Sequence, residues 1–187
     1  MYDGTLGLNA SQLTIVGVTV DGNQQILGYT GTPTLAYKNV VTPENYVNVS
    51  TMALANGGLD VTAGVASNYA LPANTYSASR NYAVVTKTPV TISATKMYDG
   101  NTNMTGFVTI LTGVTVSGVT ETLSYSGAVA SDRNVATANK YLSSLTILDS
   151  TDGSGGRVSN YIVPTLSVAT APVTLMISEP KVSQNQI

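Results

Sequence analysis

Few side chains in this sequence could carry out acid–base, nucleophilic or metal chemistry. The 187-residue chain contains no histidine and no cysteine, so the commonest general base, the thiol nucleophile and the usual ligands of transition metals are missing. Ten acidic residues remain, but their spacing does not indicate the carboxylate pair of a glycosidase. No glycine-rich phosphate loop is present either. The sequence therefore predicts a protein that is not an enzyme and holds no cofactor.

One loop has the composition of a calcium-binding segment. Asp149 and Asp152 lie among serines and glycines in residues 149–156, and carboxylate oxygens are the ligands that calcium prefers. The loop lacks a closing glutamate, and the first half of the chain has no counterpart. We therefore expect a plain flexible loop, with calcium binding by Asp149 and Asp152 as the alternative.

Charge and hydropathy exclude several classes of partner. Charged residues make up 10% of the chain, against roughly 25% in an average soluble domain. The eight basic residues are scattered, so we expect no binding to nucleic acid. No apolar run approaches the ~20 residues needed to span a bilayer, so we expect no membrane insertion. Met1 leads directly into Tyr2, and any targeting segment for export is expected outside these residues.

The strongest feature of the sequence is an internal repeat. Short motifs recur in the same order in both halves, and the spacing between copies falls from 96 residues (98 − 2) to 83 (172 − 89). The recurring motifs are Tyr-Asp-Gly at 2–4 and 98–100, Gly-Val-Thr-Val at 17–20 and 113–116, Ser-Asn-Tyr at 67–69 and 159–161, and Pro-Val-Thr at 89–91 and 172–174. We expect the two halves to adopt one fold, with a lengthened loop near residues 73–81 of the first.

Between the motifs, apolar residues alternate with polar ones. Val16, Val18 and Val20 in the first half, and Leu145 and Ile147 in the second, show the period of two that is typical of half-buried strands. Asp-Gly and Asn-Gly runs supply turns. The pattern predicts an all-β fold of two tandem small β-sandwich repeats, immunoglobulin-like and arranged end to end. Repeats with a β-grasp-like sheet are the alternative.

The junction between the repeats sets the expected domain boundaries. We assign residues 1–88 to repeat one, 89–171 to repeat two, and 172–187 to a spare C-terminal strand and tail. About a dozen residues join the two Tyr-Asp-Gly repeats, and they alternate as strands, which leaves no slack linker. A rod is therefore expected.

The two ends of the chain raise a question of strand pairing. In this register repeat one lacks an opening strand, while residues 173–178 are a spare one. Because an unpaired strand edge invites another segment, we expect head-to-tail self-association through Val173, Leu175 and Ile177 by strand addition. The alternative is that residues 90–95 and 173–178 each close the repeat before them.

The signature tyrosines have two readings. A ligand platform formed by Tyr2, Tyr69, Tyr98 and Tyr161 is one of them. We favour a structural role, because a tyrosine can end a strand with its ring in the core while Asp-Gly supplies the turn. The sequence names no ligand.

Taken together, the motifs resemble the YDG-type repeats of the "mostly-β, Gram-negative" (MBG) group, found in filamentous-haemagglutinin-like adhesins and related exported bacterial proteins. The resemblance rests on residues 96–100, 113–114, 134–135 and 159–161 and covers nearly the whole chain. The family usually has Gly-Asp where this chain has Gly22-Asn23 and Gly118-Val119. It implies an extracellular or cell-surface location in a Gram-negative bacterium, neighbouring repeats in a longer chain, and no catalytic residues.

We therefore expect a structural stalk or fibre segment of a secreted bacterial surface adhesin. The alternative is a glycan- or host-protein-binding adhesin module, and a third hypothesis is a carbohydrate-active accessory or hydrolase domain. A stalk should have polar sides without patches, whereas a binding module should expose one cluster of tyrosines.

Overall fold

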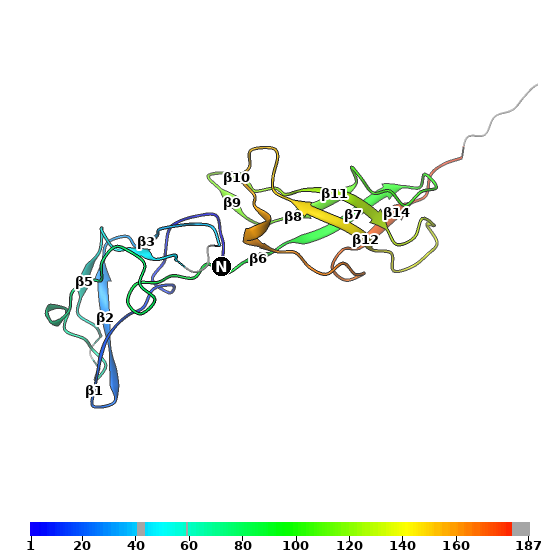
Figure 1. Ribbon diagram of the computed structural model, residues 1–187. Coiled ribbons are helices and arrows are strands. Elements are labelled where there is room, and N and C mark those ends of the chain that lie inside the picture. Colours follow the sequence, from blue (N-terminus) through cyan, green and yellow to red (C-terminus); the bar gives the residue numbers. More distant parts are fainter. Residues whose placement is uncertain (41–43, 59, 181–187) are drawn as a thin grey trace, which may run out of the picture. The chain divides into compact units, whose positions relative to one another are not determined.

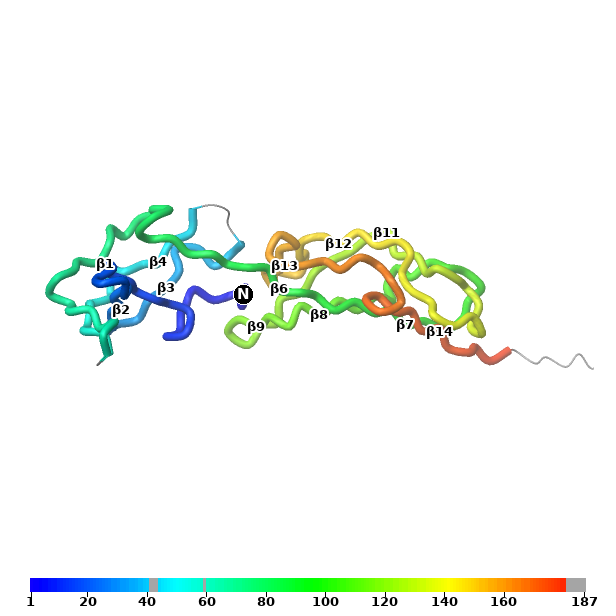
Figure 2. The backbone as a smooth tube through the Cα atoms, turned by 90° about the horizontal axis from the view of Figure 1, so that it is seen from below, coloured from blue at the N-terminus to red at the C-terminus, as the bar shows by residue number. Residues whose placement is uncertain are grey.

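The protein is built of short strands and turns (Figure 1), and Figure 2 traces the same backbone from a second direction. The computed structural model describes residues 1–40, 44–58 and 60–180, and within them the only helices are two single 3-10 turns, η1 (Ala66–Asn68) and η2 (Val158–Asn160). No helix in this part of the chain is long and apolar enough to cross a membrane. The all-β prediction is confirmed.

The chain divides into two compact units, Met1–Thr86 and Lys87–Ile187. The division lies close to the boundary expected after residue 88. Each unit is described by itself below.

Unit 1 contains two small antiparallel sheets, with strand orders β1-β2-β5 and β3-β4. Its strands are β1 (Ile15–Val20), β2 (Asn23–Thr30), β3 (Thr34–Leu35), β4 (Val47–Asn48) and β5 (Ala53–Ala55). Asp21 and Gly22 join β1 to β2 with positive φ at both positions, as the turn of a tight hairpin requires. Tyr2, Leu27 and Val47 are among its buried residues.

Unit 2 contains more regular pairing. Its strands are β6 (Thr88–Pro89), β7 (Thr91–Met97), β8 (Val108–Leu111), β9 (Thr115–Val116), β10 (Val119–Thr120), β11 (Ser124–Ala130), β12 (Leu142–Leu148), β13 (Tyr161–Ile162) and β14 (Val173–Met176). β7 lies between β14 and β8, and β11 pairs with β12. Alternate residues of β7 are buried, and Ile92, Met104 and Leu142 are each at most 1% exposed.

The C-terminal strand is not spare. β14 pairs in parallel with β7 of its own chain, with Val173 opposite Ala94 and Met176 opposite Met97, and Val173 and Leu175 are buried. The expectation of an unpaired strand beginning at residue 172 is therefore wrong, because β14 satisfies the backbone groups on the second edge of β7. Residues 181–187 of the expected tail lie outside the described residues.

The same finding bears on the expected head-to-tail contact. Val173 and Leu175 lie in β14, and Ile177, which follows it, is 78% exposed. Donation of this segment to another chain as a separate strand would require β14 to leave β7.

The two units share one framework of backbone hydrogen bonds. In unit 1 the Leu35 amide donates to the Leu6 carbonyl (2.7 Å), and in unit 2 the Ala130 amide donates to the Thr102 carbonyl (2.8 Å). These positions are 95 and 96 residues apart (130 − 35 and 102 − 6). Three further hydrogen bonds from a backbone amide to a backbone carbonyl occur in both units: Ala36 to Tyr46 and Ser131 to Tyr141, Asn68 to Val65 and Asn160 to Arg157, and Asn81 to Ser77 and Ala171 to Ser167. The internal repeat is thus present in the structure.

The loop expected near residues 73–81 is only slightly longer in unit 1. The spacing of matched positions falls from 92 residues at Asn68 (160 − 68) to 90 at Ser77 (167 − 77). Unit 1 therefore has two additional residues here. Four more residues of the length difference lie before Asn68, where the spacing falls from 96 to 92, and the rest lies after residue 86.

One expected buried face is exposed. In unit 1 Val16, Val18 and Val20 are 50%, 61% and 46% exposed, whereas Val114, the counterpart of Val18, is 4% exposed. The β1–β2 hairpin extends away from the rest of unit 1 (Figure 1), so the described residues of that unit do not cover its valine face.

In unit 1 the side chain of Asn81 binds a backbone group that has a backbone partner in unit 2. Its Oδ1 accepts from the Val47 amide (3.0 Å), and its Nδ2 donates to the Val47 carbonyl (3.0 Å). In unit 2 the amide of Leu142, the counterpart of Val47, donates to the Ala171 carbonyl instead (3.0 Å). The side chain therefore completes the framework where the backbone does not.

We predict that Asn81→Ala destabilises unit 1 by roughly 2 kcal/mol or more, because it leaves buried backbone groups of Val47 without partners. Urea unfolding followed by tyrosine fluorescence measures the change. Asn68→Ala, at an exposed asparagine of the same unit, is the control and should cost much less. Equal losses in the two variants would contradict the assigned role.

Candidate functional site

The Ser-Asn-Tyr motifs form the same structure in both units. Each is a 3-10 turn followed by a tyrosine whose amide donates back to the first residue of the turn, Tyr69 to Ala66 and Tyr161 to Val158. The extended backbone of each tyrosine then directs the chain away from the turn.

The hydroxyl groups of these tyrosines bind matching positions. Tyr69 Oη donates to Gln25 Oε1 (2.6 Å), and Tyr161 Oη donates to Glu121 Oε2 (2.6 Å). Gln25 and Glu121 are 96 residues apart (121 − 25), the spacing of the repeat. Each motif therefore ties its 3-10 turn to a distant segment, β2 in unit 1 and the residues just before β11 in unit 2.

Burial distinguishes the two copies. Tyr161 is 1% exposed and Glu121 is 2% exposed, whereas Tyr69 is only half-buried and also accepts a hydrogen bond from the Val18 amide (3.3 Å). Sequence reasoning gave no role to Gln25 or Glu121, although the 96-residue spacing links them. Buried in this way, the pair in unit 2 serves as a cross-link.

The Tyr-Asp-Gly motifs make turns. Asp3 Oδ1 accepts from the Thr5 amide (2.9 Å), and Asp99 Oδ1 accepts from the Asn101 amide (3.2 Å). The glycines that follow have φ of 78° and 84°, a conformation that favours glycine. Asp-Gly is therefore turn chemistry, as the sequence predicts.

The four signature tyrosines do not form an exposed platform. Tyr2 is 3% exposed and Tyr161 is 1% exposed, so neither can present its ring to a ligand, and Tyr98 is 40% exposed. The structural role is the one that the burial of Tyr2 and Tyr161 favours.

A buried lysine precedes the second Tyr-Asp-Gly turn. Lys96 is 3% exposed, and its Nζ donates to Asn101 Oδ1 (2.9 Å) and the Asn103 carbonyl (2.7 Å) and pairs with Asp99 Oδ1 (2.7 Å). The ammonium also lies 5.7 Å from the centre of the Phe107 ring. Its hydrogen bond lowers the pKa of Asp99. Sequence reasoning included Lys96 among the scattered basic residues and in the motif at 96–100 without giving it a role, yet it fixes this turn.

The acidic loop is closed by its own hydrogen bonds. Asp152 Oδ1 accepts from the Ser154 amide (2.9 Å) and the Ser150 hydroxyl, while its Oδ2 accepts from the Thr122 hydroxyl (2.7 Å). Asp149 Oδ1 accepts from the Val158 amide (2.8 Å). Both carboxylates of the calcium alternative are therefore engaged by donors of the protein.

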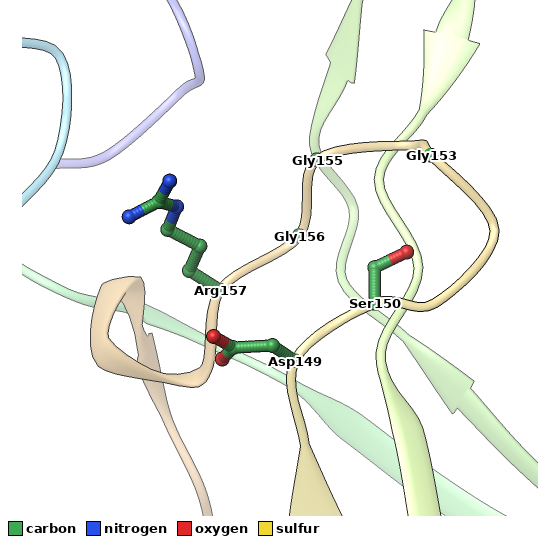
Figure 3. Close-up of a pocket in the computed structure, with 6 residues that line it drawn as sticks. All are labelled: Asp149, Ser150, Gly153, Gly155, Gly156 and Arg157. Atoms are coloured by element: carbon green, nitrogen blue, oxygen red, sulfur yellow. The ribbon is translucent and has the colours of Figure 1, made fainter.

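The same loop borders an open pocket of about 380 Å³. Figure 3 shows Asp149 and Arg157 on the two loop segments that flank the pocket. The lining residues are Asp149, Ser150, Gly153, Gly155, Gly156 and Arg157. Within the described residues no three acidic side chains come together as metal ligands.

Unit 1 exposes a tyrosine pair that sequence reasoning missed. The rings of Tyr37 and Tyr46 meet edge to face, with centroids 6.4 Å apart, and Tyr37 is 52% exposed. Asn45, fully buried, holds Tyr37 by accepting from its amide (3.0 Å) and donating to its carbonyl (2.7 Å). The Ala83 amide donates to the Asn45 carbonyl (2.9 Å). This hydrogen bond places the backbone of the preceding residue, Tyr82, near Asn45. No periodic pattern in the sequence signals this pairing.

Comparison with known proteins identified no relative. The chain matches no protein-family model, no curated protein and no solved structure.

We predict that Tyr161→Phe destabilises unit 2 by about 1–3 kcal/mol, because the buried Glu121 carboxyl loses a hydrogen bond. Tyr69→Phe should cost less, since Gln25 is partly exposed. Glu121→Gln reproduces the residue of unit 1 and should retain most of the stability. Thermal unfolding of the three variants tests this order, and a larger loss for Tyr69→Phe would contradict it.

A pH dependence follows from Asp152. The Ser150 and Thr122 hydroxyls and the Ser154 amide hold the pKa of its carboxyl well below its ordinary value of 3.8. A lowered pKa in the folded state stabilises the loop above pH 3.8, and the effect is lost as the pH falls below that value. Amide exchange at Ser154 should therefore accelerate, relative to exposed amides, between pH 4 and the most acidic conditions tolerated. Asp152→Asn should abolish the extra pH dependence; if it persists, another group is responsible.

Proposed function

We propose that this chain is a structural stalk or fibre segment of a secreted bacterial surface adhesin. The observation that carries the proposal is one hydrogen-bond framework built twice in tandem, with the Tyr-Asp-Gly and Ser-Asn-Tyr motifs used as turns and cross-links in both copies. A spacer needs repetition of a stable unit, and the signature residues supply stability.

The junction supports a spacer role. Unit 2 begins at Lys87, directly after the last residue of unit 1, and β6 begins at Thr88. Residues 84–91 are valines, threonines, one lysine and one proline, rather than the glycine and serine of flexible linkers. Neighbouring repeats of a longer chain, exported to the surface of a Gram-negative bacterium, would extend such a stalk.

For the domain type, strand order favours the β-grasp-like alternative over the sandwich. β7 lies between β8 and β14, antiparallel to β8 and parallel to β14, and the isolated Tyr141–Pro172 bridge places the start of β12 beside β14. A sandwich would instead divide these strands between two facing sheets. We therefore propose YDG-type repeats with a β-grasp-like sheet.

A second candidate function is glycan or host-protein binding by unit 1. The pair of Tyr37 and Tyr46 supports it, because exposed aromatic rings held in a fixed geometry are what such a surface needs. In unit 2 the position of Tyr37 is taken by Asp132, so the pair is not part of the repeated framework.

The stalk is tested by small-angle X-ray scattering. We predict an elongated particle, because the junction leaves no slack linker. A variant with ten Gly/Ser residues inserted between Thr86 and Lys87 is the control, and its distance distribution should broaden. A near-spherical envelope for the unmodified chain would rule out the stalk.

The binding candidate is tested on a glycan array with the unmodified chain and Tyr37→Ala. A glycan that the unmodified chain binds and the Tyr37→Ala variant does not bind would establish binding by this surface. Arg133→Ala, in the matching loop of unit 2, is the control and should leave the profile unchanged. An array without signal leaves the stalk as the better account, and a parallel hydrolase screen should show no turnover.

A further inference from the structure

The loop that follows β12 carries a negative charge that the repeated framework does not require. In unit 2 Asp149 Oδ1 accepts from the Val158 amide (2.8 Å), and in unit 1 Asn56 Oδ1 accepts from the Ala66 amide (2.8 Å). The two contacts are equivalent, because the acceptors are 93 residues apart (149 − 56) and the donors are 92 apart (158 − 66). The framework needs an oxygen acceptor here, and a neutral amide supplies one in unit 1.

The same loop carries a positive charge that is also confined to unit 2. Arg157 directly precedes the turn η2, and Val65 holds the same place before η1. The Arg157 carbonyl accepts from the Asn160 amide (2.9 Å), as the Val65 carbonyl accepts from the Asn68 amide (3.0 Å). The backbone of Arg157 therefore serves the framework, whereas its guanidinium group has no counterpart in unit 1.

Both charged groups have unused hydrogen-bonding capacity. Among the described residues the Arg157 guanidinium has no hydrogen-bond or ion-pair partner, and Asp149 Oδ2 accepts from no donor. Both side chains are exposed, and they do not pair with each other. Five N–H donors of a guanidinium group and one carboxylate oxygen are thus available to a ligand.

These two side chains flank the pocket of about 380 Å³ (Figure 3). Its remaining lining is one serine and three glycines, so no apolar side chain borders it. A Cβ at Gly153 or Gly155 would meet nothing within 4 Å, which leaves open space beside the backbone between the two charges. The volume lies in the lower part of the range of about 300–1,000 Å³ that is typical of small-molecule sites. The pocket therefore suits a small hydrophilic ligand.

The chemistry of the two groups limits the class of ligand. Arg157 repels a metal cation, and Asp149 and Asp152 repel a phosphate or sulfate of high charge. A carboxylate carries a single negative charge and matches the planar fork of an arginine. Asp149 Oδ2 can accept from hydroxyl groups, which form short, charge-assisted hydrogen bonds with a carboxylate. A sugar acid carries one carboxylate and several hydroxyl groups on one rigid ring.

We propose that this pocket binds a uronate residue of an acidic glycan, with its carboxylate on Arg157 and its ring hydroxyls on Asp149. The loop is already fixed, because Asp152 accepts from the Thr122 hydroxyl (2.7 Å) and the Ser154 amide (2.9 Å). The site rests on charges that only unit 2 has, and it is independent of the stalk role and of the Tyr37 surface.

The test is an NMR titration of the full chain with sodium glucuronate. We expect saturable shifts of the Gly153 and Gly155 amides with a dissociation constant of about 1 mM, as a few charge-assisted hydrogen bonds provide. Glucose, which lacks the carboxylate, and acetate, which lacks the hydroxyls, should each bind roughly tenfold more weakly or worse, the loss expected for one charge-assisted contact.

Two variants carry the residues that unit 1 has at the matching positions. Arg157→Val should weaken glucuronate binding roughly tenfold or more. Asp149→Asn keeps an oxygen acceptor for the Val158 amide but loses the free carboxylate oxygen, so it should weaken glucuronate and not acetate, for which Asp149 is only a like charge. Neither variant should change the thermal unfolding midpoint. Arg133→Val, at another exposed arginine of unit 2, is the control and should bind glucuronate unchanged.

Each contrary result would overturn a stated part of the proposal. An absence of shifts with glucuronate would overturn the site, and the stalk role would be unaffected. Binding of acetate as tight as that of glucuronate would exclude the sugar hydroxyls, and equal binding of glucose would exclude the carboxylate. An equal loss in Arg133→Val and Arg157→Val would show attraction to positive charge in general rather than to this pocket.

Discussion

Each unit depends on the hydrogen bond that joins its first signature residue to its closing segment. Tyr2 with Thr86 and Tyr98 with Met176 bring together residues more than 75 positions apart. In a domain of very short strands and few charges, local pairing cannot satisfy the backbone, so distant segments must supply the partners. The chain closure that results also buries Tyr2 in unit 1 and Leu175 in unit 2.

The same backbone demand explains the buried polar side chains. Asn45 in unit 1 and Lys140 in unit 2 hold matching positions, 95 residues apart (140 − 45), and both are buried. Asn45 binds the Tyr37 backbone, and the Lys140 ammonium donates to the Val135 carbonyl (3.0 Å). Different side chains thus satisfy carbonyl groups of the same loop, since a buried carbonyl without a donor would cost more than either solution.

Much of this arrangement could be predicted from the sequence. The repeated motifs and the period of two predict strands, turns and two copies of one domain, because they reflect local backbone geometry. The pairing of β14 could not be predicted in the same way. Its sequence resembles an opening strand, and its place in its own unit follows from contacts that no local pattern shows, the pairing with β7 and the Val173–Lys140 hydrogen bond.

The candidate sites were harder to predict for a related reason. Tyr37 and Tyr46 come together through the buried side-chain amide of Asn45, which lies 8 residues after Tyr37 in the sequence, and no periodic signal marks this contact. The valine face of β1 has the pattern of a buried strand, yet Val18 is exposed where its counterpart Val114 is covered. A pattern shows that a face can be buried, whereas the remainder of the fold determines whether anything covers it.

Contacts that occur in both units and features that occur in only one unit therefore have different roles in this chain. Tyr69 and Tyr161 make the same hydroxyl contact in both units, although the acceptor changes from an amide to a carboxyl group. A contact that survives a change of partner serves the scaffold. Features confined to one unit, such as the Tyr37 ring pair and the loop around Asp152, are not required by that scaffold, so recognition of a ligand is best sought there. A chain whose units share one framework can accommodate such differences one unit at a time, because each unit closes through its own backbone hydrogen bonds.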